Sequence, residues 1–319
     1  MRVRAVAVNP VDAISGIARR VVTPWLTYPA VLGSDVAGEV VEVGEGVTRF
    51  RPGDRVLGHA IGQERARNCA AEGAFQRFVV LVEHMVSPLP DGLDDEHAAV
   101  LPLGLSTAAA GLFELDQLAL PAPTLDAPER GASVVVWGGS TSVGSNAIQL
   151  ARSAGYDVIA TASPRNFAYL RHLGATEALD YHAGDVERRI VEALRGRQLA
   201  GILAIGKGSL PKAVRIAAQT EGSRRVASTY PTPVTTARAA LARRRGVHVS
   251  AIWGGTPSES PVGPAIYAGF LPAALAAGRF LAAPEPAVVG SGLAAIPDAL
   301  RQLRQGVSAS KLVVTLPGG

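Results

Sequence analysis

The sequence contains one cysteine, Cys69, so no disulfide can form within the chain. This usage is typical of a protein in a reducing compartment, and we expect a cytoplasmic location. Aromatic residues make up only 5% of the chain, and the three lysines are Lys207, Lys212 and Lys311. With so few aromatic residues, and no basic tract beyond the arginines at 243–245, the composition argues against a nucleic-acid partner.

The sequence also lacks a stretch that is suited to cross a membrane. The apolar run Val262–Gly278 is interrupted by Pro264 and Pro272, and proline interrupts helical hydrogen bonding. We therefore expect no membrane partner. Charged residues make up 18% of the chain and hydrophobic residues 48%, which indicates a globular enzyme. A length of 319 residues is enough for two domains with a sizeable core.

Metal ligands are scarce as well. A zinc site needs thiolate, imidazole or carboxylate ligands, usually at short spacings. Cys69 has no second cysteine to join it, and none of the six histidines shows ligand spacing. These histidines are His59, His84, His97, His172, His182 and His248. We expect them to be surface or structural residues, and we expect no metal site.

The most informative stretch predicts a strand, a glycine turn, a helix and a second strand. Residues 134–137 (VVVW) form a short apolar run that is typical of a buried parallel strand. Apolar residues then recur on one helical face, with Ser142 as the expected N-cap and Gly155 as the expected end. Residues 157–161 form the second strand. This order is that of the first unit of a dinucleotide-binding fold.

The turn before this helix is expected to hold a pyrophosphate, because N–H groups at a helix N-terminus attract anions. The usual G-x-G-x-x-G pattern reads here as Gly138, Ser140, Thr141 and Gly144, without the middle glycine. The expected phosphate-binding residues are Gly138, Gly139, Ser140, Thr141, Ser142 and Val143. The alternative is an ordinary buried strand–helix–strand unit of another α/β protein.

The end of the second strand predicts which dinucleotide is bound. An NAD site carries an acidic side chain about 20 residues after the first glycine, where it accepts a hydrogen bond from the ribose 2′-hydroxyl. No Asp or Glu occurs between Ile159 and Phe167, where Ser163, Arg165 and Asn166 stand instead. A guanidinium and a hydroxyl suit a 2′-phosphate, so the pattern favours NADPH. The alternative is that Arg165 is only a solvated loop charge.

The remaining segments differ in pattern on the two sides of this stretch. Residues 1 to about 115 combine short strands with tight glycine turns, as in a small, partly open barrel. Alternating strands and helices continue to about residue 255. Expected helices are 186–194, 210–218, 272–280 and 296–305, and expected strands are 201–205, 225–228, 247–252, 287–289 and 311–316.

Five motifs occur in the order found in the medium-chain dehydrogenase/reductase superfamily, which the chain resembles along essentially its full length. They are NPVD at Asn9, GSDVAGEVVEVGEGVTRFRPGDRV from Gly33, LSTA at 105–108, the turn at Gly138 and SKLVV at 310–314. Each motif alone is weak evidence for this superfamily, but all five in the same order are specific to it. The segments VWGGSTSVGSNAIQLA and TASPRNF are most similar to those of zinc-independent quinone-oxidoreductase-like proteins. These two segments are closer still to the trans-acting enoyl reductases of polyketide pathways.

The resemblance implies an α/β fold with two domains. A GroES-like β-barrel domain would be built from both chain ends, residues 1–115 and 262–319. A Rossmann domain, a doubly wound parallel sheet that binds NADP(H), would span residues 116–261. Family members commonly have about 25 to 30 further residues before the strand at 2–8, so we expect either a misassigned start or a barrel with an exposed edge strand. The family habit also implies a homodimer.

The resemblance further implies that hydride from NADPH reduces an activated C=C bond or a quinone. The substrate would be a small molecule: an enone, an enoyl thioester or a quinone. The other residues implied are Asn9, Asp12 and Thr107 beside the nicotinamide in the substrate cleft, Tyr181 at the adenosine, Trp253 over the nicotinamide, and Lys311 from the C-terminal segment. Each has a structural alternative, such as helix capping for Asn9 and Asp12 or core packing for Trp253.

Zinc-dependent members of the superfamily bind the catalytic metal through a Cys, a His-Glu pair and a second Cys or carboxylate. This sequence has NPVD and Ser34-Asp35 at the first two of these places, so the resemblance implies zinc independence. No general acid is identifiable, because Arg20 stands where related enoyl reductases place a tyrosine. The alternative function is that of a non-catalytic NADPH-binding relative, either redox-responsive or structural.

Overall fold

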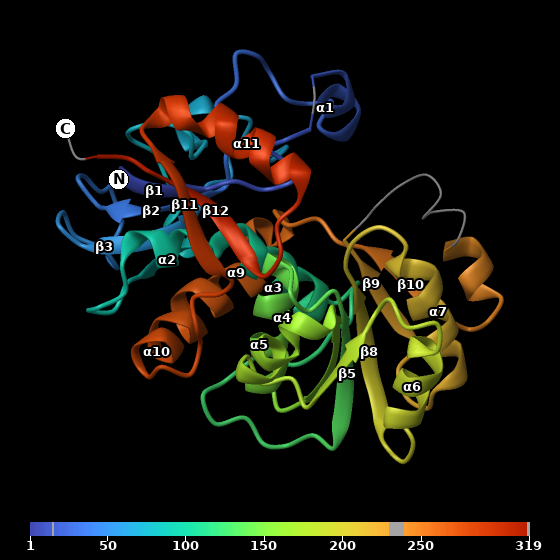
Figure 1. The fold of residues 1–319 in the computed structure, drawn as a ribbon. Helices are drawn as coiled ribbons and strands as arrows, with labels where there is room; N and C mark the ends of the chain where they lie inside the picture. The colour runs from blue at the N-terminus through green and yellow to red at the C-terminus, as the bar shows by residue number, and fades with distance from the viewer. Residues whose placement is uncertain (15, 230–238, 318–319) are drawn as a thin grey trace. The chain divides into compact units, whose positions relative to one another are not determined.

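The computed structural model describes residues 1–14, 16–229 and 239–317, and the chain divides into two compact units. Unit 1 contains residues 1–103 and 263–319, and unit 2 contains residues 104–262 (Figure 1). Unit 1 is therefore built from both ends of the chain, whereas unit 2 is one continuous segment. The domain limit expected at residue 115 falls inside the segment that belongs to unit 2.

Unit 2 contains a six-stranded parallel sheet in the order β10-β9-β8-β5-β6-β7. Its strands are β5 (Ala132–Trp137), β6 (Asp157–Ala162), β7 (Glu177–Asp180), β8 (Gln198–Ala204), β9 (Arg225–Ser228) and β10 (His248–Ala251). The chain runs outward from β5 to β7, returns to β8 beside β5, and then runs outward to β10. This doubly wound order confirms the expected fold class, and such sheets bind ligands at the carboxyl ends of the strands where the order reverses.

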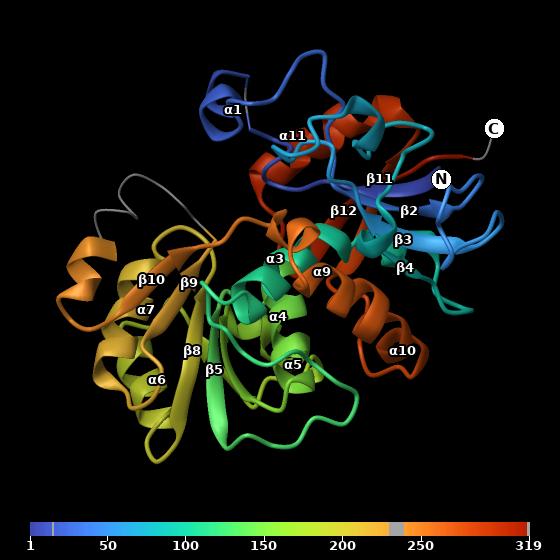
Figure 2. The ribbon, with the colours of Figure 1, turned by 180° about the vertical axis from the view of Figure 1, so that it is seen from behind.

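Helices cover both faces of this sheet (Figures 1 and 2). They are α4 (Ser142–Ser153) and α5 (Phe167–His172) on one face and α6 (Val186–Ala193) and α7 (Ser209–Gln219) on the other, with α3 (Pro102–Phe113) before β5. Ile190 of α6 and Val214 of α7 are buried in one core with Val135 of β5. The apolar spacing of these helices therefore predicts both their positions and their buried faces.

The start of α4 corrects the expected cap. Thr141, not Ser142, is the N-cap residue, since the Thr141 side chain accepts a hydrogen bond from the Gly144 N–H at 3.0 Å. The Thr141 hydroxyl also donates to the Gly138 carbonyl oxygen at 2.8 Å. Thr141 keeps an extended backbone, with φ −80° and ψ 162°, as a cap residue requires. Ser142 is the first residue of the helix itself.

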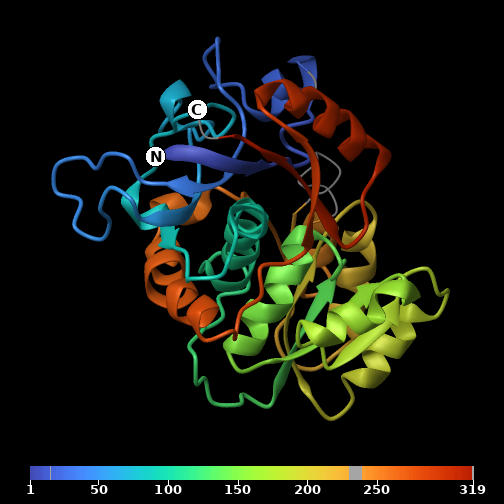
Figure 3. The ribbon, with the colours of Figure 1, turned by 60° about the vertical axis from the view of Figure 1, so that its left-hand side comes forward.

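Unit 1 contains a second six-stranded sheet, in the order β11-β12-β1-β2-β3-β4. Its strands are β1 (Arg2–Ala7), β2 (Asp35–Glu39), β3 (Arg55–His59), β4 (Val86–Pro88), β11 (Glu285–Ser291) and β12 (Ser310–Thr315). All neighbours are antiparallel except β11 and β12. Strands β1 and β12 lie side by side, so the first and last strands of the chain form the middle of one sheet (Figure 3).

The helices of unit 1 are short. They include α1 (Gly16–Val22), α2 (Asp95–Ala99), α10 (Leu271–Ala276) and α11 (Ile296–Gln305), with α9 (Val262–Pro264) at the boundary. Short 3₁₀ segments occur at Ala70–Glu72, Glu83–Met85 and Leu293–Ala295 in unit 1, and at Pro164–Asn166 and Thr256–Glu259 in unit 2. Ile296 and Ala299 of α11 pack into the same core as Val314 of β12.

The helix expected at 272–280 begins earlier and ends sooner. Helical residues run from Val262 to Ala276, with a π-helical stretch at Ala265–Phe270 between α9 and α10. Pro264 ends α9, and Pro272 is the second residue of α10. Pro264 lies in the first turn of the run, where its missing N–H costs no helical hydrogen bond, and Pro272 lies just after the π-helical stretch, so these prolines mark junctions and do not end the helical run.

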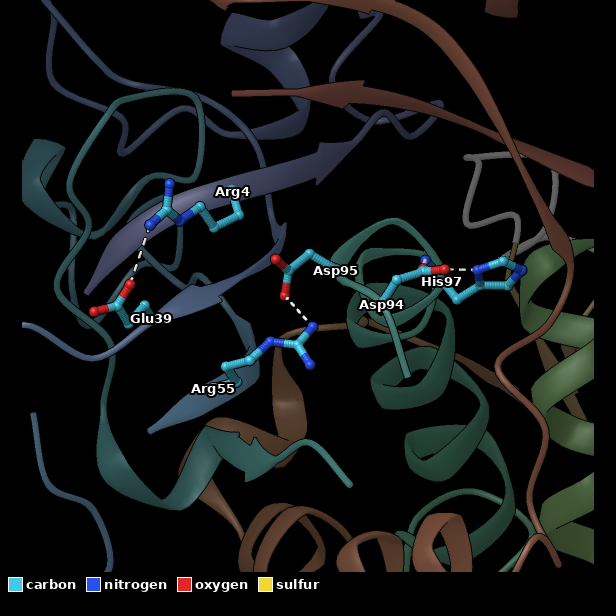
Figure 4. A network of polar contacts seen from close by, with 6 residues as sticks. All are labelled: Arg4, Glu39, Arg55, Asp94, Asp95 and His97. Atoms are coloured by element: carbon cyan, nitrogen blue, oxygen red, sulfur yellow. Dashed lines mark hydrogen bonds and ion pairs between the residues drawn. The ribbon is translucent and has the colours of Figure 1, made fainter. Parts of the chain in front are cut away.

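Exposed ion pairs connect side chains on the surface of unit 1 (Figure 4). Arg55 of β3 reaches Asp95 at the start of α2 at 2.8 Å. Asp94 caps α2 by accepting from the His97 N–H at 2.8 Å and lies 2.7 Å from the His97 ring. The burial of the His97 side chain opposes a positive charge there, but its hydrogen bond to Asp94 outweighs this and the pKa of His97 rises. The Arg55–Asp95 pair joins α2 to the sheet, and exposed pairs of this kind add little stability individually.

The assignment of the N-cap leads to a first prediction. Removing the Thr141 hydroxyl leaves the Gly144 N–H without its cap, so the Thr141→Ala variant should lose about 1 kcal/mol of unfolding free energy. Ser142→Ala, one residue later, is the matched control and should lose less. Urea unfolding followed by circular dichroism measures both. A larger loss for Ser142→Ala than for Thr141→Ala would contradict the assignment.

Candidate functional site

The carboxyl ends of three neighbouring strands bring the predicted cofactor residues together in unit 2. Strand β5 pairs with β6 so that Trp137 lies opposite Thr161, and β6 pairs with β7 so that Ala162 lies opposite Asp180. The residues that follow these positions are the turn at 138–143, the segment 163–166 and Tyr181. The register of a parallel sheet therefore places all three segments along one edge.

The turn after β5 has the backbone geometry that a phosphate site requires. Gly138 has φ +89°, which favours glycine, and its N–H donates to the Thr161 hydroxyl at 3.1 Å. Gly139 donates its N–H to the Thr161 carbonyl oxygen at 2.8 Å. A Cβ at Gly144 would collide with the Gly138 carbonyl oxygen, so the last glycine of the motif is required for close packing of α4. The turn thus leads directly into the N-terminus of α4, with Ser140 just before the cap and Val143 in the first turn of the helix.

The segment after β6 carries the residues that are predicted to hold the 2′-phosphate. Ser163 is half-buried, Arg165 is exposed and Asn166 is buried, all within the 3₁₀ segment Pro164–Asn166 or just before it. No carboxylate belongs to this segment. Tyr181 is 37% exposed, and its ring lies 3.9 Å from the His182 ring, centroid to centroid. The edge therefore offers a cation, a hydroxyl and an aromatic pair, which suit an adenosine phosphate.

A second cluster of polar residues is buried in unit 1, around Asp35 at the start of β2. Asp35 is fully buried and forms an ion pair with Lys311 of β12, with 2.5 Å between Oδ2 and Nζ. The Asn9 amide donates to the same oxygen at 2.6 Å, and the Leu103 N–H donates to Oδ1 at 2.5 Å. Buried carboxylates need such partners. Lys311, which is only 4% exposed, is therefore held inside unit 1 by its ion pair.

Asp12 belongs to the same cluster but is only partly satisfied. It is 3% exposed, its Oδ2 accepts from the Asn9 N–H at 2.9 Å, and its Oδ1 has no hydrogen-bond partner among the described residues. Burial raises the pKa of Asp12 to about 6, and the nearby Asp35 adds to the rise, while the Asn9 N–H, Arg19 and Lys311 oppose it. Asn9 and Asp12 thus form a turn ahead of α1, which begins only at Gly16, and belong to a buried charge cluster.

Sequence reasoning missed the place of His59, the fourth titratable member of this cluster after Asp35, Lys311 and Asp12. His59 lies at the end of β3, opposite Asp35 of β2, and is 1% exposed. Burial lowers the pKa of His59 to about 4, with Lys311 adding to the fall and Asp35 opposing it. His59 is therefore neutral at neutral pH. The pairing of β2 with β3 is the signal that brings it to Asp35, and no local motif in the sequence contains that pairing.

Two other predicted residues belong to other elements of unit 2. Thr107 is half-buried within α3 of unit 2, and Trp253 is half-buried just after β10 in the same unit. A pocket of about 180 Å³ occurs in unit 1. Its walls include Leu26, Tyr28, Pro29, Val31, Asn68 and Cys69. The pocket is large enough for a small ring or a short acyl chain.

The described residues contain neither a cluster of metal ligands nor a membrane-spanning helix. In the described ranges, which omit residues 15, 230–238 and 318–319, no three or more His, Cys, Asp or Glu side chains gather as metal ligands would. No helix in the same ranges has the length and apolar character needed to traverse a bilayer.

Known proteins match the chain along both units. Residues 1–91 match the family described as alcohol dehydrogenase GroES-like domain, and residues 142–262 match the family described as zinc-binding dehydrogenase. The dehydrogenase azaJ of Aspergillus niger is 48% identical over 325 residues, which span 99% of this chain and 91% of that protein. The trans-enoyl reductase himH of Aspergillus japonicus is 36% identical over 318 residues, which span 99% and 89%.

Among solved structures, the quinone oxidoreductase from Pseudomonas syringae pv. Tomato DC3000 is similar in fold. Its TM-score is 0.71 at 25% identity, with 98% of this chain and 90% of that chain covered. The chain is thus similar over its whole described length to oxidoreductases that carry a GroES-like domain.

The buried carboxyl of Asp12 leads to a prediction about pH. Folding favours its protonated form between pH 3.8, its ordinary pKa, and about 6, so the stability that Asp12 contributes is lost as the pH rises through this window. The unfolding free energy of Asp12→Asn minus that of the wild type should therefore rise by roughly 2 kcal/mol from pH 4 to pH 7. His59 acts in the opposite direction in both proteins, so it cancels in the difference.

Guanidinium unfolding at several pH values measures this difference. Asp91→Asn, at an exposed carboxyl of the same unit, is the control and should show a constant difference. A pH-independent difference for Asp12→Asn would show that the Asp12 carboxyl is not protonated preferentially in the folded protein.

Proposed function

Because the chain belongs to the medium-chain dehydrogenase/reductase superfamily, in its quinone-oxidoreductase and enoyl-reductase-like branch, we propose that it is an NADPH-dependent, zinc-independent reductase of activated C=C bonds or quinones. Its relatives support an oxidoreductase with a nicotinamide cofactor. The specific substrate class rests on trans-enoyl reductases and quinone oxidoreductases among those relatives. An enone, an enoyl thioester or a quinone would be the hydride acceptor.

One observation carries the choice of NADPH over NADH. Strand β6 ends at Ala162, and the segment after it supplies Ser163 and Arg165 but no carboxylate. A carboxylate there would accept from a ribose 2′-hydroxyl and repel a 2′-phosphate. Arginine and serine side chains instead donate hydrogen bonds to phosphate oxygens. The proposal is that Ser163, Arg165 and Asn166 hold the 2′-phosphate and that Tyr181 contacts the adenosine.

The turn after β5 would hold the pyrophosphate. The N-terminus of α4 fits an anion, and Gly144 lets the helix start close to the turn, since a Cβ there would meet the Gly138 carbonyl oxygen. Ser140, Ser142 and Val143 would supply N–H groups or hydroxyls around the pyrophosphate, while Thr141, whose N–H and hydroxyl are bonded to Gly138 and Gly144, would hold the turn in shape. When bound, the cofactor supplies hydride to the acceptor. The residues of the chain orient the two reactants, exclude water and donate hydrogen bonds to the oxygen on which negative charge develops.

The donor set of unit 1 does not fit a zinc ion. Asp35 stands in the GSD sequence, and both of its oxygens are engaged, by Lys311, Asn9 and the Leu103 N–H. A metal at Asp35 would have to share this carboxylate with a buried ammonium. Asn9 offers an amide where zinc prefers thiolate or imidazole. The proposal therefore assigns Asn9 and Asp12 to the nicotinamide side of the site without a metal, and the pocket beside Tyr28 to an apolar part of the substrate.

Isothermal titration with NADPH and NADH tests the cofactor, and a panel of enones, enoyl thioesters and quinones tests the activity. We expect tighter binding of NADPH and its oxidation with at least one acceptor class. NADPH binding without turnover on any acceptor would instead support the non-catalytic alternative. Equal affinity for the two cofactors would contradict the cofactor assignment.

Arg165 provides the mutational test. Arg165→Gln removes a charged hydrogen bond to the 2′-phosphate, so NADPH affinity should fall by about 1.5–3 kcal/mol, or roughly 10- to 150-fold, while NADH affinity stays constant. Arg195→Gln is the matched control, because Arg195 is an exposed arginine in the turn before β8, at the opposite ends of the strands. Both affinities falling together in Arg165→Gln would argue for a structural role.

A further inference from the structure

Lys212 is an ammonium group at the carboxyl edge of unit 2 that no sequence motif identified. It lies in the first turn of α7, and its Nζ is 5.1 Å from the centroid of the Trp137 ring. The same Nζ is 3.4 Å from the Tyr181 carbonyl oxygen. Trp137 is the last residue of β5 and Tyr181 directly follows β7. Lys212 is thus held between the ends of two strands of the sheet.

No acidic side chain among the described residues forms an ion pair with the Lys212 ammonium. Glu187 is the nearby acid on α6, and it forms two hydrogen bonds with Arg215, at 2.7 and 2.6 Å. Those bonds are the main reason that the pKa of Glu187 is lowered, with a smaller effect from Lys212. Asp180 accepts from the His182 N–H at 3.0 Å. Among the described residues, no carboxylate forms an ion pair with Lys212.

The position of Lys212 coincides with the end of the proposed site that receives the adenosine. Tyr181 follows Asp180, which pairs with Ala162, and Ala162 precedes Ser163. The Lys212 ammonium, Tyr181 and the Ser163–Arg165 segment therefore belong to one corner of the edge. A cation that rests on an aromatic face and on one backbone carbonyl keeps N–H groups for another acceptor, because an ammonium has three.

We propose that Lys212 is a second cation for the 2′-phosphate of the bound cofactor, in addition to Arg165, which follows the intervening strand β6. This inference rests on the proposed NADPH dependence. The Trp137 ring and the Tyr181 carbonyl oxygen hold the ammonium in place before the ligand arrives, so little side-chain entropy is lost on binding. A phosphate monoester carries up to two negative charges, so two cations neutralise it better than one.

A purely structural role for Lys212 makes a different prediction. If Lys212 only fastened α7 to Trp137, its loss would lower the stability of the ligand-free protein and would not distinguish between nucleotides. If it binds the 2′-phosphate, its loss affects only ligands that carry this group. Adenosine 2′,5′-bisphosphate and 5′-AMP differ by that phosphate alone, so the pair isolates the effect without requiring turnover.

The experiment is isothermal titration of both nucleotides into the wild type, Arg165→Gln, Lys212→Gln, Lys212→Arg and Lys207→Gln at fixed salt. We expect Lys212→Gln to bind the bisphosphate about tenfold more weakly and 5′-AMP within twofold of the wild type. Lys212→Arg should recover most of the loss, because the cation is retained. Lys207→Gln, which removes an exposed lysine from the preceding loop, is the matched control and should change neither affinity by more than twofold.

The outcomes separate this inference from the proposed function. If the wild type does not prefer the bisphosphate to 5′-AMP, the NADPH assignment itself fails. If the wild type prefers it and Arg165→Gln loses that preference while Lys212→Gln keeps it, only the role of Lys212 is overturned. An equal loss in Lys212→Gln and Lys207→Gln would also overturn it, because it would indicate a general effect of charge.

Discussion

The register of β5, β6 and β7 is the constraint on which the cofactor half of the molecule depends. Backbone hydrogen bonds place Trp137 opposite Thr161 and Ala162 opposite Asp180, and the Gly138 N–H adds a bond to the Thr161 hydroxyl. Because parallel strands all end at the same edge, this register alone gathers the glycine turn, the Ser163–Arg165 segment and Tyr181. A shift of one strand by one residue would reverse its faces and separate these groups.

Unit 1 depends on a different interaction, the buried ion pair of Asp35 and Lys311. It joins β2 to β12, and so joins segments from the two ends of the chain. Removing one partner would leave an uncompensated buried charge, which costs far more than the pair contributes. The same pair engages the carboxylate that a metal would need, which supports the proposed zinc-independent reaction.

Features set by local pattern could be predicted from the sequence. The spacing of apolar residues located α6, α7 and α11 to within a residue at each end, because a helix must bury one face. The sequence pattern indicated Ser142 as the cap, and this was wrong: Thr141 and Ser142 both carry a hydroxyl, and only the backbone angles distinguish them. The sequence pattern also does not predict contacts between residues of distant segments. The contacts of Lys311 with Asp35 and of Lys212 with Trp137 follow from the order of the strands. Periodicity predicts that a face is buried, but not which residues pack against it.

The central claim is that unit 2 seats a doubly phosphorylated nucleotide by main-chain N–H groups and side-chain cations at one edge of its sheet. A crystal structure of the protein with NADP⁺ tests this most directly. We expect the pyrophosphate at the turn formed by residues 140–143 and the 2′-phosphate in contact with Ser163 and Arg165. An adenosine phosphate bound away from these residues, or a metal ion coordinated by Asp35, would contradict it.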